Sequence, residues 1–247
     1  MTAGSFTVAQ FAVVAGAIFL SALVTSVAGF GFGLMSVPLI SLVIDLHSAV
    51  IVSSIVGVIG NGVQTLEYRG VRDRELAKRL CLASIVGLPF GYAIYASVSD
   101  SALRIALGIA VVIAVVALSR GLNLTHIGVS MDWVLGFLSG VLNSSISTSG
   151  PPLVFDLQAR HLAPTTFRAT IQYIFLVSGT VGLVIFAVGG KIDQEVLVAG
   201  LISVPALFLG LAAGVPLRSR FSPERFRVLV LVLLLAGAAA TVSKAFS

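Results

Sequence analysis

The chain has 247 residues, of which 57% are hydrophobic and only 10% carry a charge, and its formal net charge is +5. A chain this apolar lacks the polar surface that a water-soluble fold needs, so the composition excludes a soluble globule and predicts an all-α integral membrane protein. The 15 Lys and Arg residues lie in short clusters between apolar stretches. Such clusters contact lipid headgroups, and we expect no binding of nucleic acid.

Charged residues divide the sequence into uncharged windows that are each about one bilayer long. The windows are 1–44, 46–66, 80–99, 105–119, 133–155, 169–190, 196–217 and 228–243. About 20 helical residues cross a hydrocarbon core of about 30 Å, so most windows predict one crossing helix, and the first is too long for one. The windows leave no room for a soluble domain, so we expect a single transmembrane domain over residues 1–247.

Short features recur in the same order in the two halves of the chain. Pro38-Leu39, His47, Gly87, Gly91, Ser99 and Arg104 match Pro152-Leu153, His161, Gly210, Gly214, Ser222 and Arg227. Chance similarity among glycine-rich helices is the alternative, but the shared order favours a duplication. We expect one repeat over about 6–121 and a second over about 130–245.

The distribution of basic residues predicts the topology. If window 133–155 crossed the membrane once, the basic residues would divide almost evenly between the two sides. If it enters and returns as a re-entrant hairpin, all of them except Arg104, Lys191 and Lys244 lie in the cytoplasm, which satisfies the positive-inside rule. By the repeat, residues 8–44 also form a hairpin. Each half then has a hairpin and three crossings, so the halves are inverted and both termini lie outside.

Each expected hairpin contains a break in its helical pattern. The first reads Ala-Gly-Phe-Gly-Phe-Gly-Leu-Met-Ser-Val-Pro over 28–38, and the second reads Asn-Ser-Ser-Ile-Ser-Thr-Ser-Gly-Pro-Pro over 143–152. Glycine and proline interrupt α-helices. Non-helical backbone inside a membrane is tolerated only where protein buries it or where it lines a wet cavity. Matched breaks in two repeats therefore predict a transport site.

The returning arm of each hairpin begins with backbone N–H groups that have no partner within the helix. Together with the positive end of the helix dipole, such groups bind anions, and the Ser and Thr hydroxyls and the Asn143 amide add further donors. We expect the two breaks to hold an oxyanion without a buried arginine. The alternative is that the glycines only allow close helix packing and that the hydroxyls bond back to their own helices.

Polar residues elsewhere in the windows are candidates for the same cavity, although amides also join neighbouring helices. Asn61 and Gln64 lie one turn apart, and Gln172 and Tyr173 lie in the corresponding window of the second half. The residues expected to bind substrate are Gly29, Gly31, Gly33, Ser36, Pro38, Asn61, Gln64, Asn143, Ser145, Ser147, Thr148, Ser149, Gly150, Pro151, Gln172 and Tyr173.

A few ionisable residues lie near the expected site. Arg168 precedes Gln172 by one turn and either attracts an anion at the cytoplasmic mouth or marks the end of a span. Asp156 and Arg160 have the i, i+4 spacing of a helical ion pair, and Asp156 is also the candidate for coupling transport to protons. His47 and His161 are expected at span boundaries, with a role in proton transfer as the alternative.

These features resemble the TauE/SafE sulfite exporter family of membrane proteins, also called the toluene sulfonate uptake permease group. The resemblance rests on Gly-Phe-Gly-Phe-Gly and Pro-Leu within 29–39, on Ser-Gly-Pro-Pro-Leu over 149–153, and on the glycine pairs at 87 and 91 and at 210 and 214. It covers essentially the whole chain. It implies an inner-membrane carrier, bacterial or archaeal, for sulfur-containing anions such as sulfite, sulfonates and sulfoacetate or for related organic acids.

The sequence therefore favours a secondary transporter that moves a small sulfur-containing or organic anion by alternating access between the two halves. A passive anion channel would use the same breaks without a coupling group. A membrane-embedded enzyme would need a nucleophile and a base, for which only Ser147 or Ser149 with His161 offers itself. No metal-binding motif is present and Cys81 is the single cysteine, so we expect no cofactor or metal. A homodimer is compatible with the sequence.

Overall fold

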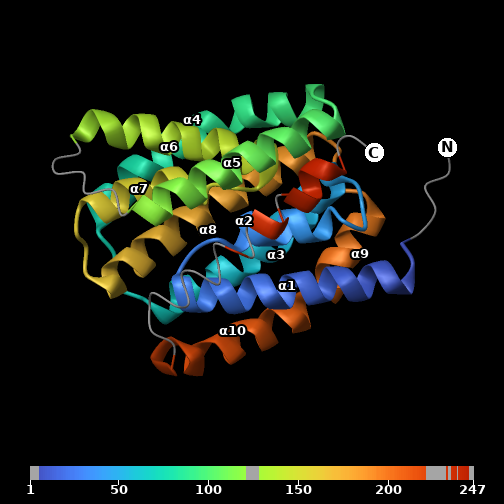
Figure 1. Ribbon diagram of the computed structural model, residues 1–247. Coiled ribbons are helices and arrows are strands. Elements are labelled where there is room, and N and C mark those ends of the chain that lie inside the picture. The colour runs from blue at the N-terminus through green and yellow to red at the C-terminus, as the bar shows by residue number, and fades with distance from the viewer. Residues whose placement is uncertain (1–5, 121–127, 221–231, 233–234, 238, 245–247) are drawn as a thin grey trace.

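The computed structural model describes residues 6–120, 128–220, 232, 235–237 and 239–244 (Figure 1). Ten helices lie in the described residues up to 220, and no described residue is in a strand. The helices are α1 (Val8–Ala28), α2 (Phe32–Ile40), α3 (Leu46–Glu67), α4 (Arg74–Ser97), α5 (Asp100–Arg120), α6 (Val129–Ile146), α7 (Gly150–Ala159), α8 (Pro164–Val188), α9 (Gln194–Ile202) and α10 (Val204–Arg220). Residues 235–237 and 239–243 are also helical, whereas most of the last expected crossing, 228–243, lies outside the described residues.

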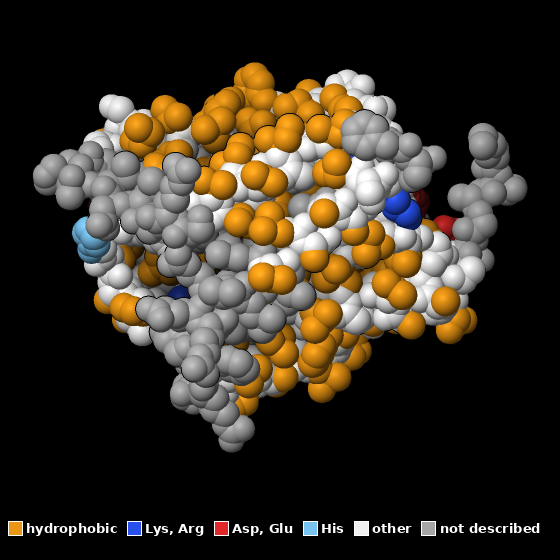
Figure 2. Space-filling view, viewed as in Figure 1, with side chains coloured by type: hydrophobic (Ala, Val, Ile, Leu, Met, Phe, Trp, Pro, Cys, Tyr) orange, Lys and Arg blue, Asp and Glu red, His pale blue; other side chains and the backbone are white. Residues whose placement is uncertain are grey.

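Five helical segments are long and apolar enough to cross a membrane: α1, α3, α4, α8 and the stretch Gln194–Leu217, which joins α9 and α10. Figure 2 shows hydrophobic side chains spread over the whole length of the bundle, whereas the charged side chains in view lie towards its two ends. The protein is thus an all-α integral membrane protein, as its composition predicts. Ser203 interrupts the α9–α10 stretch and its hydroxyl donates to the carbonyl of Ala199.

Both expected hairpins contain a break at the expected place. A capping box of Thr7 and Gln10 starts α1, which ends at Gly29 with a left-handed φ of 86°. The partner break follows α6 at Ser147, with a φ of 53°. The chain then turns back, so that α2 packs on α1 and α7 packs on α6. The two arms differ in length, because α1 has 21 residues and can cross the membrane alone, whereas α2 has only 9.

Two helix pairs pack backbone to backbone at glycines. A Cβ added to Gly87 or Gly91 of α4 would lie well under 3.0 Å from a backbone carbonyl of α6. A Cβ added to Gly210 or Gly214 of α10 would likewise lie under 3.0 Å from a backbone carbonyl of α1. The glycine pairs that match in sequence therefore occupy the same kind of interface, and each interface joins a helix of one half to a helix of the other.

Two other sequence matches do not occupy equivalent positions. Pro38 lies near the end of α2, whereas Pro152 lies in the first turn of α7. His47 lies in the first turn of α3, whereas His161 lies in the turn before α8 with a φ of 50°. The residue that corresponds to Gly29 is instead Ser147. Each of the two adopts the left-handed conformation at the end of a long helix, and a short helix follows.

At one end of the bundle a buried ion-pair network joins three helices. Asp132 at the start of α6 is fully buried and accepts from Nε of Arg79 on α4 at 2.8 Å and from Nη2 of Arg160 after α7. Arg160 also lies 3.4 Å from Asp156, so the ion pair predicted from the i, i+4 spacing is confirmed. The sequence did not indicate Asp132 as the centre of this network.

The opposite end of the bundle is held by Asp100, Arg104 and His47. Asp100 accepts from Nε of Arg104 at 2.6 Å and from the backbone N–H of Leu46 at 2.7 Å. Asp45, His47 and Asp100 bring possible metal-ligating atoms within 4.8 Å of one another. Asp45 already accepts from the N–H of Ser48, so the two carboxylates serve here as caps for the first turn of α3.

The start of α1 and the end of the described chain lie at this same end. Nε2 of Gln10 donates to the carbonyl of Val43, and Nζ of Lys244 donates to the carbonyl of Leu42. Both contacts reach the turn between α2 and α3. The side chains of Arg120, Arg218, Arg220, Arg225 and Arg227, which the topology prediction places in the cytoplasm, lie outside the described residues.

Candidate functional site

A cavity lies between the two breaks, halfway along α3 and α8. Its walls come from residues 53–61 of α3 and 175–179 of α8, and its ends from the two breaks. The volume is about 50 Å³, a few times the roughly 10–15 Å³ that one water molecule requires. None of the described residues that line it carries a charge. The lining residues are Thr25, Gly31, Phe32, Gly33, Leu34, Ser53, Ser54, Gly57, Val58, Asn61, Asn143, Ser147, Thr148, Ser149, Gly150, Phe175 and Gly179.

The two breaks touch each other at this cavity. A Cβ added to Gly33 would lie far under 3.0 Å from the carbonyl oxygen of Ser147. Ser147 adopts a left-handed φ, which residues other than glycine rarely adopt. Bonds from Ser147 N to the Asn143 carbonyl and from Thr148 N to the Leu142 carbonyl hold it there. The second break is thus fixed by its own backbone and supports the start of α2.

The start of α2 presents unpartnered backbone donors to the cavity. Gly31, with a φ of 97°, precedes the helix and provides no side-chain cap. The N–H groups of Phe32, Gly33 and Leu34 make no hydrogen bond to another described residue. All three residues line the cavity, so the positive end of the α2 dipole lies at its wall.

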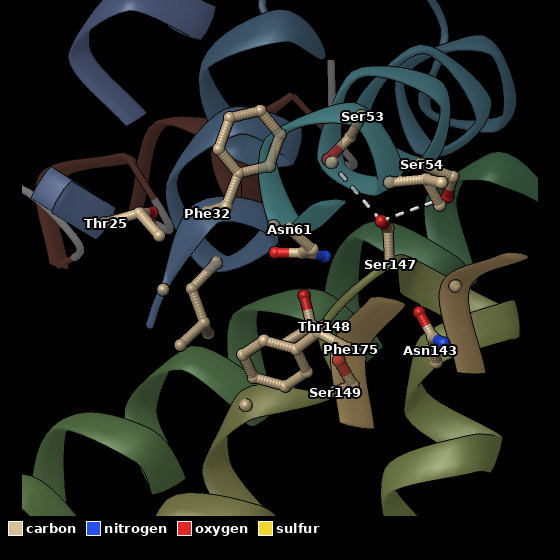
Figure 3. Close-up of a pocket in the computed structure, with 17 residues that line it drawn as sticks. Thr25, Phe32, Ser53, Ser54, Asn61, Asn143, Ser147, Thr148, Ser149 and Phe175 are labelled. Carbon is tan, nitrogen blue, oxygen red and sulfur yellow. Dashed lines mark hydrogen bonds between the residues drawn. The ribbon is translucent and has the colours of Figure 1, made fainter. Parts of the chain in front are cut away.

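Side-chain donors surround the second break (Figure 3). The hydroxyl of Ser147 lies 3.1 Å from Oγ of Ser54 and 3.4 Å from Oγ of Ser53, both on α3. Nδ2 of Asn143 is buried and has no hydrogen-bond partner among the described residues. An unpaired buried amide costs roughly 1–3 kcal/mol unless a ligand or water accepts from it. Because Asn143 lines the cavity, its side-chain amide is a candidate donor to a bound anion.

The start of α7 contributes less than the sequence argument expected. Pro151 and Pro152 occupy its first turn, and proline has no backbone N–H. Of the first three residues of α7, only Gly150 can donate. The two helix starts are therefore unequal, and most backbone donors come from α2.

The structure brings half of the predicted substrate-binding residues to the cavity and places the others outside it. Those at the cavity are Gly31, Gly33, Asn61, Asn143, Ser147, Thr148, Ser149 and Gly150. Among the others, Pro151 follows Gly150 in α7, and Pro38 and Gln64 are buried beyond the lining. Ser36 bonds to Ser53 at 2.6 Å, and Ser145 donates back to the Val141 carbonyl of its own helix.

Gln172 and Arg168 hold the first break rather than line the cavity. Nε2 of Gln172 donates to the Gly29 carbonyl at 2.9 Å, and Nη2 of Arg168 donates to the Val27 carbonyl at 2.8 Å. The Arg168 side chain also lies against Gly29. Tyr173 points elsewhere, with its ring 4.1 Å from the guanidinium carbon of Arg72. Asp156 is buried in the ion-pair network, and its Oδ2 has no partner among the described residues.

The sequence analysis missed several lining residues, above all Ser53 and Ser54. Ser54, Gly57 and Asn61 recur at i, i+3 and i+7, which places them on one face of α3. That spacing was available in the sequence. Thr25, at the end of α1, gave no comparable signal, because serine and threonine in helices usually bond back to their own backbone, as Thr25 also does to the Ser21 carbonyl.

The family model for sulfite exporter TauE/SafE matches residues 14–241. A probable sulfite/organosulfonate exporter TauE from Cupriavidus necator is 30% identical over 95 residues, which are 38% of this chain and 37% of that protein. A probable inner membrane transporter protein TsaS from Comamonas testosteroni is 29% identical over 100 residues, 40% of this chain and 42% of that protein.

The matched stretches thus span less than half the length of these two relatives. No solved structure matches the chain significantly. The family model, in contrast, begins within α1 and extends beyond the end of α10. The chain belongs to the sulfite exporter TauE/SafE family.

Proposed function

We propose that the protein is a membrane transporter for sulfite, organosulfonates or similar small organic anions, and that the negatively charged group binds in the cavity between the two breaks. The observation that carries the proposal is an uncharged cavity between the two breaks, lined by Asn143 and by Phe32, Gly33 and Leu34 at the start of α2. The Asn143 amide nitrogen and the three backbone N–H groups have no hydrogen-bond partner among the described residues. Family membership and the names of the two relatives support the sulfur-containing substrate class.

The cavity suits an oxyanion because it offers several donors and no charge. Backbone N–H groups, the Asn143 amide and the hydroxyls of Ser53, Ser54 and Ser147 can each donate to an oxygen atom. A neutral site binds an anion without holding it as tightly as a buried arginine would, which allows release. The small volume fits a single sulfite or sulfonate group, and a longer organic tail requires the breaks to separate.

We also propose that the two halves of the chain, about 6–121 and 130–245, form inverted repeats, and that access to the cavity alternates between the two sides of the membrane. The matching glycine interfaces of α4 with α6 and of α10 with α1 support this arrangement. By the positive-inside rule, the end with Arg72, Arg79 and Arg160 faces the cytoplasm. The chain ends would then lie on the periplasmic side of a bacterial or archaeal inner membrane.

Asp156 is the candidate for coupling to protons in this proposal. It is fully buried, it shares Arg160 with Asp132, and its Oδ2 has no partner among the described residues. Buried carboxylates in membrane proteins commonly serve in proton relays. Replacement by asparagine should leave anion binding intact and abolish stimulation of uptake by a pH gradient in proteoliposomes.

The alternative of an enzyme would require a base beside Ser147 or Ser149. Neither His47 nor His161 lines the cavity, and they lie at opposite ends of the bundle; His126 lies outside the described residues. A passive channel would share the cavity. Counterflow distinguishes it from a carrier, because only a carrier accumulates labelled anion when unlabelled anion leaves the vesicle.

The binding test uses purified protein in detergent and isothermal titration with sulfite, sulfate, thiosulfate, taurine, sulfoacetate and acetate, with a neutral sulfoxide for comparison. We expect an anion to bind best. Asn143→Leu should weaken that binding about tenfold or more, because a hydrogen bond to a charged group contributes roughly 1.5–3 kcal/mol. Thr180→Val is the control, since Thr180 is exposed on α8 and donates to the Leu176 carbonyl. Tightest binding of the neutral solute would sink the proposal.

A further inference from the structure

A second cavity lies on the outside of the bundle between α4 and α8, away from the central cavity. Its volume is about 380 Å³. The residues that line it are Arg72, Arg74, Lys78, Cys81, Leu82, Ile85, Tyr173 and Val177. One end of it is formed by Arg72, Arg74 and Lys78, in and just before the start of α4. This is the end of the bundle that holds the network around Asp132. This outer cavity has no part in the proposed transport site.

The end of the outer cavity formed by Arg72, Arg74 and Lys78 is positively charged, and none of the described residues that line the cavity is acidic. Arg72, Arg74 and Lys78 form no ion pair with another residue in the described part of the chain. The neighbouring carboxylate of Asp73 instead accepts from the backbone N–H of Leu76. The ring of Tyr173 holds Arg72 by a cation–π contact. Three cations that form no ion pair within the described residues are therefore available to an anionic group.

The other end of the outer cavity is apolar and continues onto an exposed apolar face of α4. Lys78, Leu82 and Ile85 follow one another at i, i+4 and i+7 on one face of α4. Leu82 is 45% exposed, and Val177 of α8 forms the facing wall. The surface therefore changes from cationic to apolar along α4, in the direction from the headgroup level into the hydrocarbon.

We propose that the outer cavity is a binding site for an anionic phospholipid. The phosphate of the headgroup lies between Arg72, Arg74 and Lys78, and an acyl chain follows Leu82, Ile85 and Val177. Basic pockets between helices at the cytoplasmic side of a membrane bind such headgroups, at about 1 kcal/mol for each Lys or Arg. A soluble anion would contact only the three basic residues, so the apolar residues that line the rest of the outer cavity favour a lipid.

The test compares lipid binding by the purified protein with two matched variants. Native mass spectrometry and thermal unfolding in detergent are measured with phosphatidylglycerol or with phosphatidylcholine. We expect phosphatidylglycerol alone to remain bound and to raise Tm. In R74Q/K78Q its affinity should fall about 30-fold, since two charges are removed. The control R69Q removes one exposed charge at the same end of the bundle but outside the outer cavity, and it should bind phosphatidylglycerol as the wild type does.

Two further measurements decide between a lipid and a soluble anion. Glycerol 3-phosphate, which carries the charged group without acyl chains, should not displace phosphatidylglycerol at equal concentration, and L82S should weaken lipid binding although it keeps every charge. Unfolding of each variant without lipid shows whether its fold is intact. Equal affinity of R74Q/K78Q and R69Q for phosphatidylglycerol would overturn the proposal, as would displacement by glycerol 3-phosphate. These readouts do not involve the transported anion, so they are independent of the proposed function.

Discussion

Gly33 and Ser147 bring the two breaks into backbone contact, because the space that a Cβ on Gly33 would need is occupied by the Ser147 carbonyl. Two segments more than 100 residues apart thus meet without any side chain between them. The first prediction follows from this contact. Gly33→Ala should displace the start of α2, lower stability by about 1–3 kcal/mol as overpacking does, and abolish anion binding.

The control for this substitution is Gly16→Ala. Gly16 is exposed within α1 and has nothing within 4 Å of an added Cβ, so alanine should raise stability by up to about 1 kcal/mol. Thermal unfolding and anion titration measure both variants. Normal anion binding by Gly33→Ala would show that the breaks can separate without loss of the site.

The interface between α4 and α6 gives the second prediction. Gly87→Ala should destabilise the protein by about 1–3 kcal/mol, because the added methyl meets backbone atoms that cannot rotate away. Gly182→Ala is the matched control, since its nearest neighbour, a Leu88 methyl carbon, would lie at an ordinary 3.6 Å. Unfolding by denaturant in mixed micelles compares the two. Equal stability of both variants would contradict the close packing.

The buried network around Asp132 gives the third prediction. Asp132→Asn leaves Arg79 and Arg160 without their shared carboxylate. Removing one member of a buried ion-pair network typically costs about 3–5 kcal/mol, and somewhat less here because both arginines are partly exposed. Glu75→Gln, at an exposed acid in the first turn of α4, should have almost no effect. The same unfolding assay measures both, and a tolerated Asp132→Asn would mean that water replaces the carboxylate.

The fourth prediction concerns pH. Burial acts to raise the pKa of Asp100, but hydrogen bonds from Arg104 and from the Leu46 N–H, with the charge of Arg104, lower it below its ordinary value of 3.8. A group whose pKa is lowered by folding stabilises the protein above its unfolded pKa, and that contribution is lost as the pH falls through the folded pKa. The difference in Tm between wild type and Asp100→Asn should therefore be largest near pH 7 and shrink below about pH 4. A constant difference would contradict it.

The sequence predicted the two breaks because alternating glycines in the first and the Ser-Thr-Ser-Gly-Pro-Pro run in the second each gather several helix-interrupting residues within an uncharged window. It did not predict which side chains turn towards the cavity. Gln172 and Tyr173 illustrate the reason, since adjacent residues point about 100° apart around a helix. Gln172 consequently meets Gly29 inside the bundle, whereas Tyr173 meets Arg72 outside it.

Ser53 illustrates the other limit of the sequence. Its hydroxyl reaches the cavity only because the second break lies beside α3, and that proximity joins residues 94 positions apart. Asp132 was missed for a similar reason, since its two arginine partners come from α4 and from the end of α7. Spacing along one helix predicts neighbours on that helix, but contacts between distant segments follow from tertiary packing alone.

The glycine contacts of α4 with α6 and of α10 with α1 also restrict how the protein can move. Helices whose backbones touch have no layer of side chains that could change rotamer and let one slide along the other. Each pair should therefore travel as one rigid body. Any rearrangement that opens the central cavity must then occur where these bodies meet α3 and α8, and spin labels placed within a pair should keep a constant separation while labels across α3 change theirs.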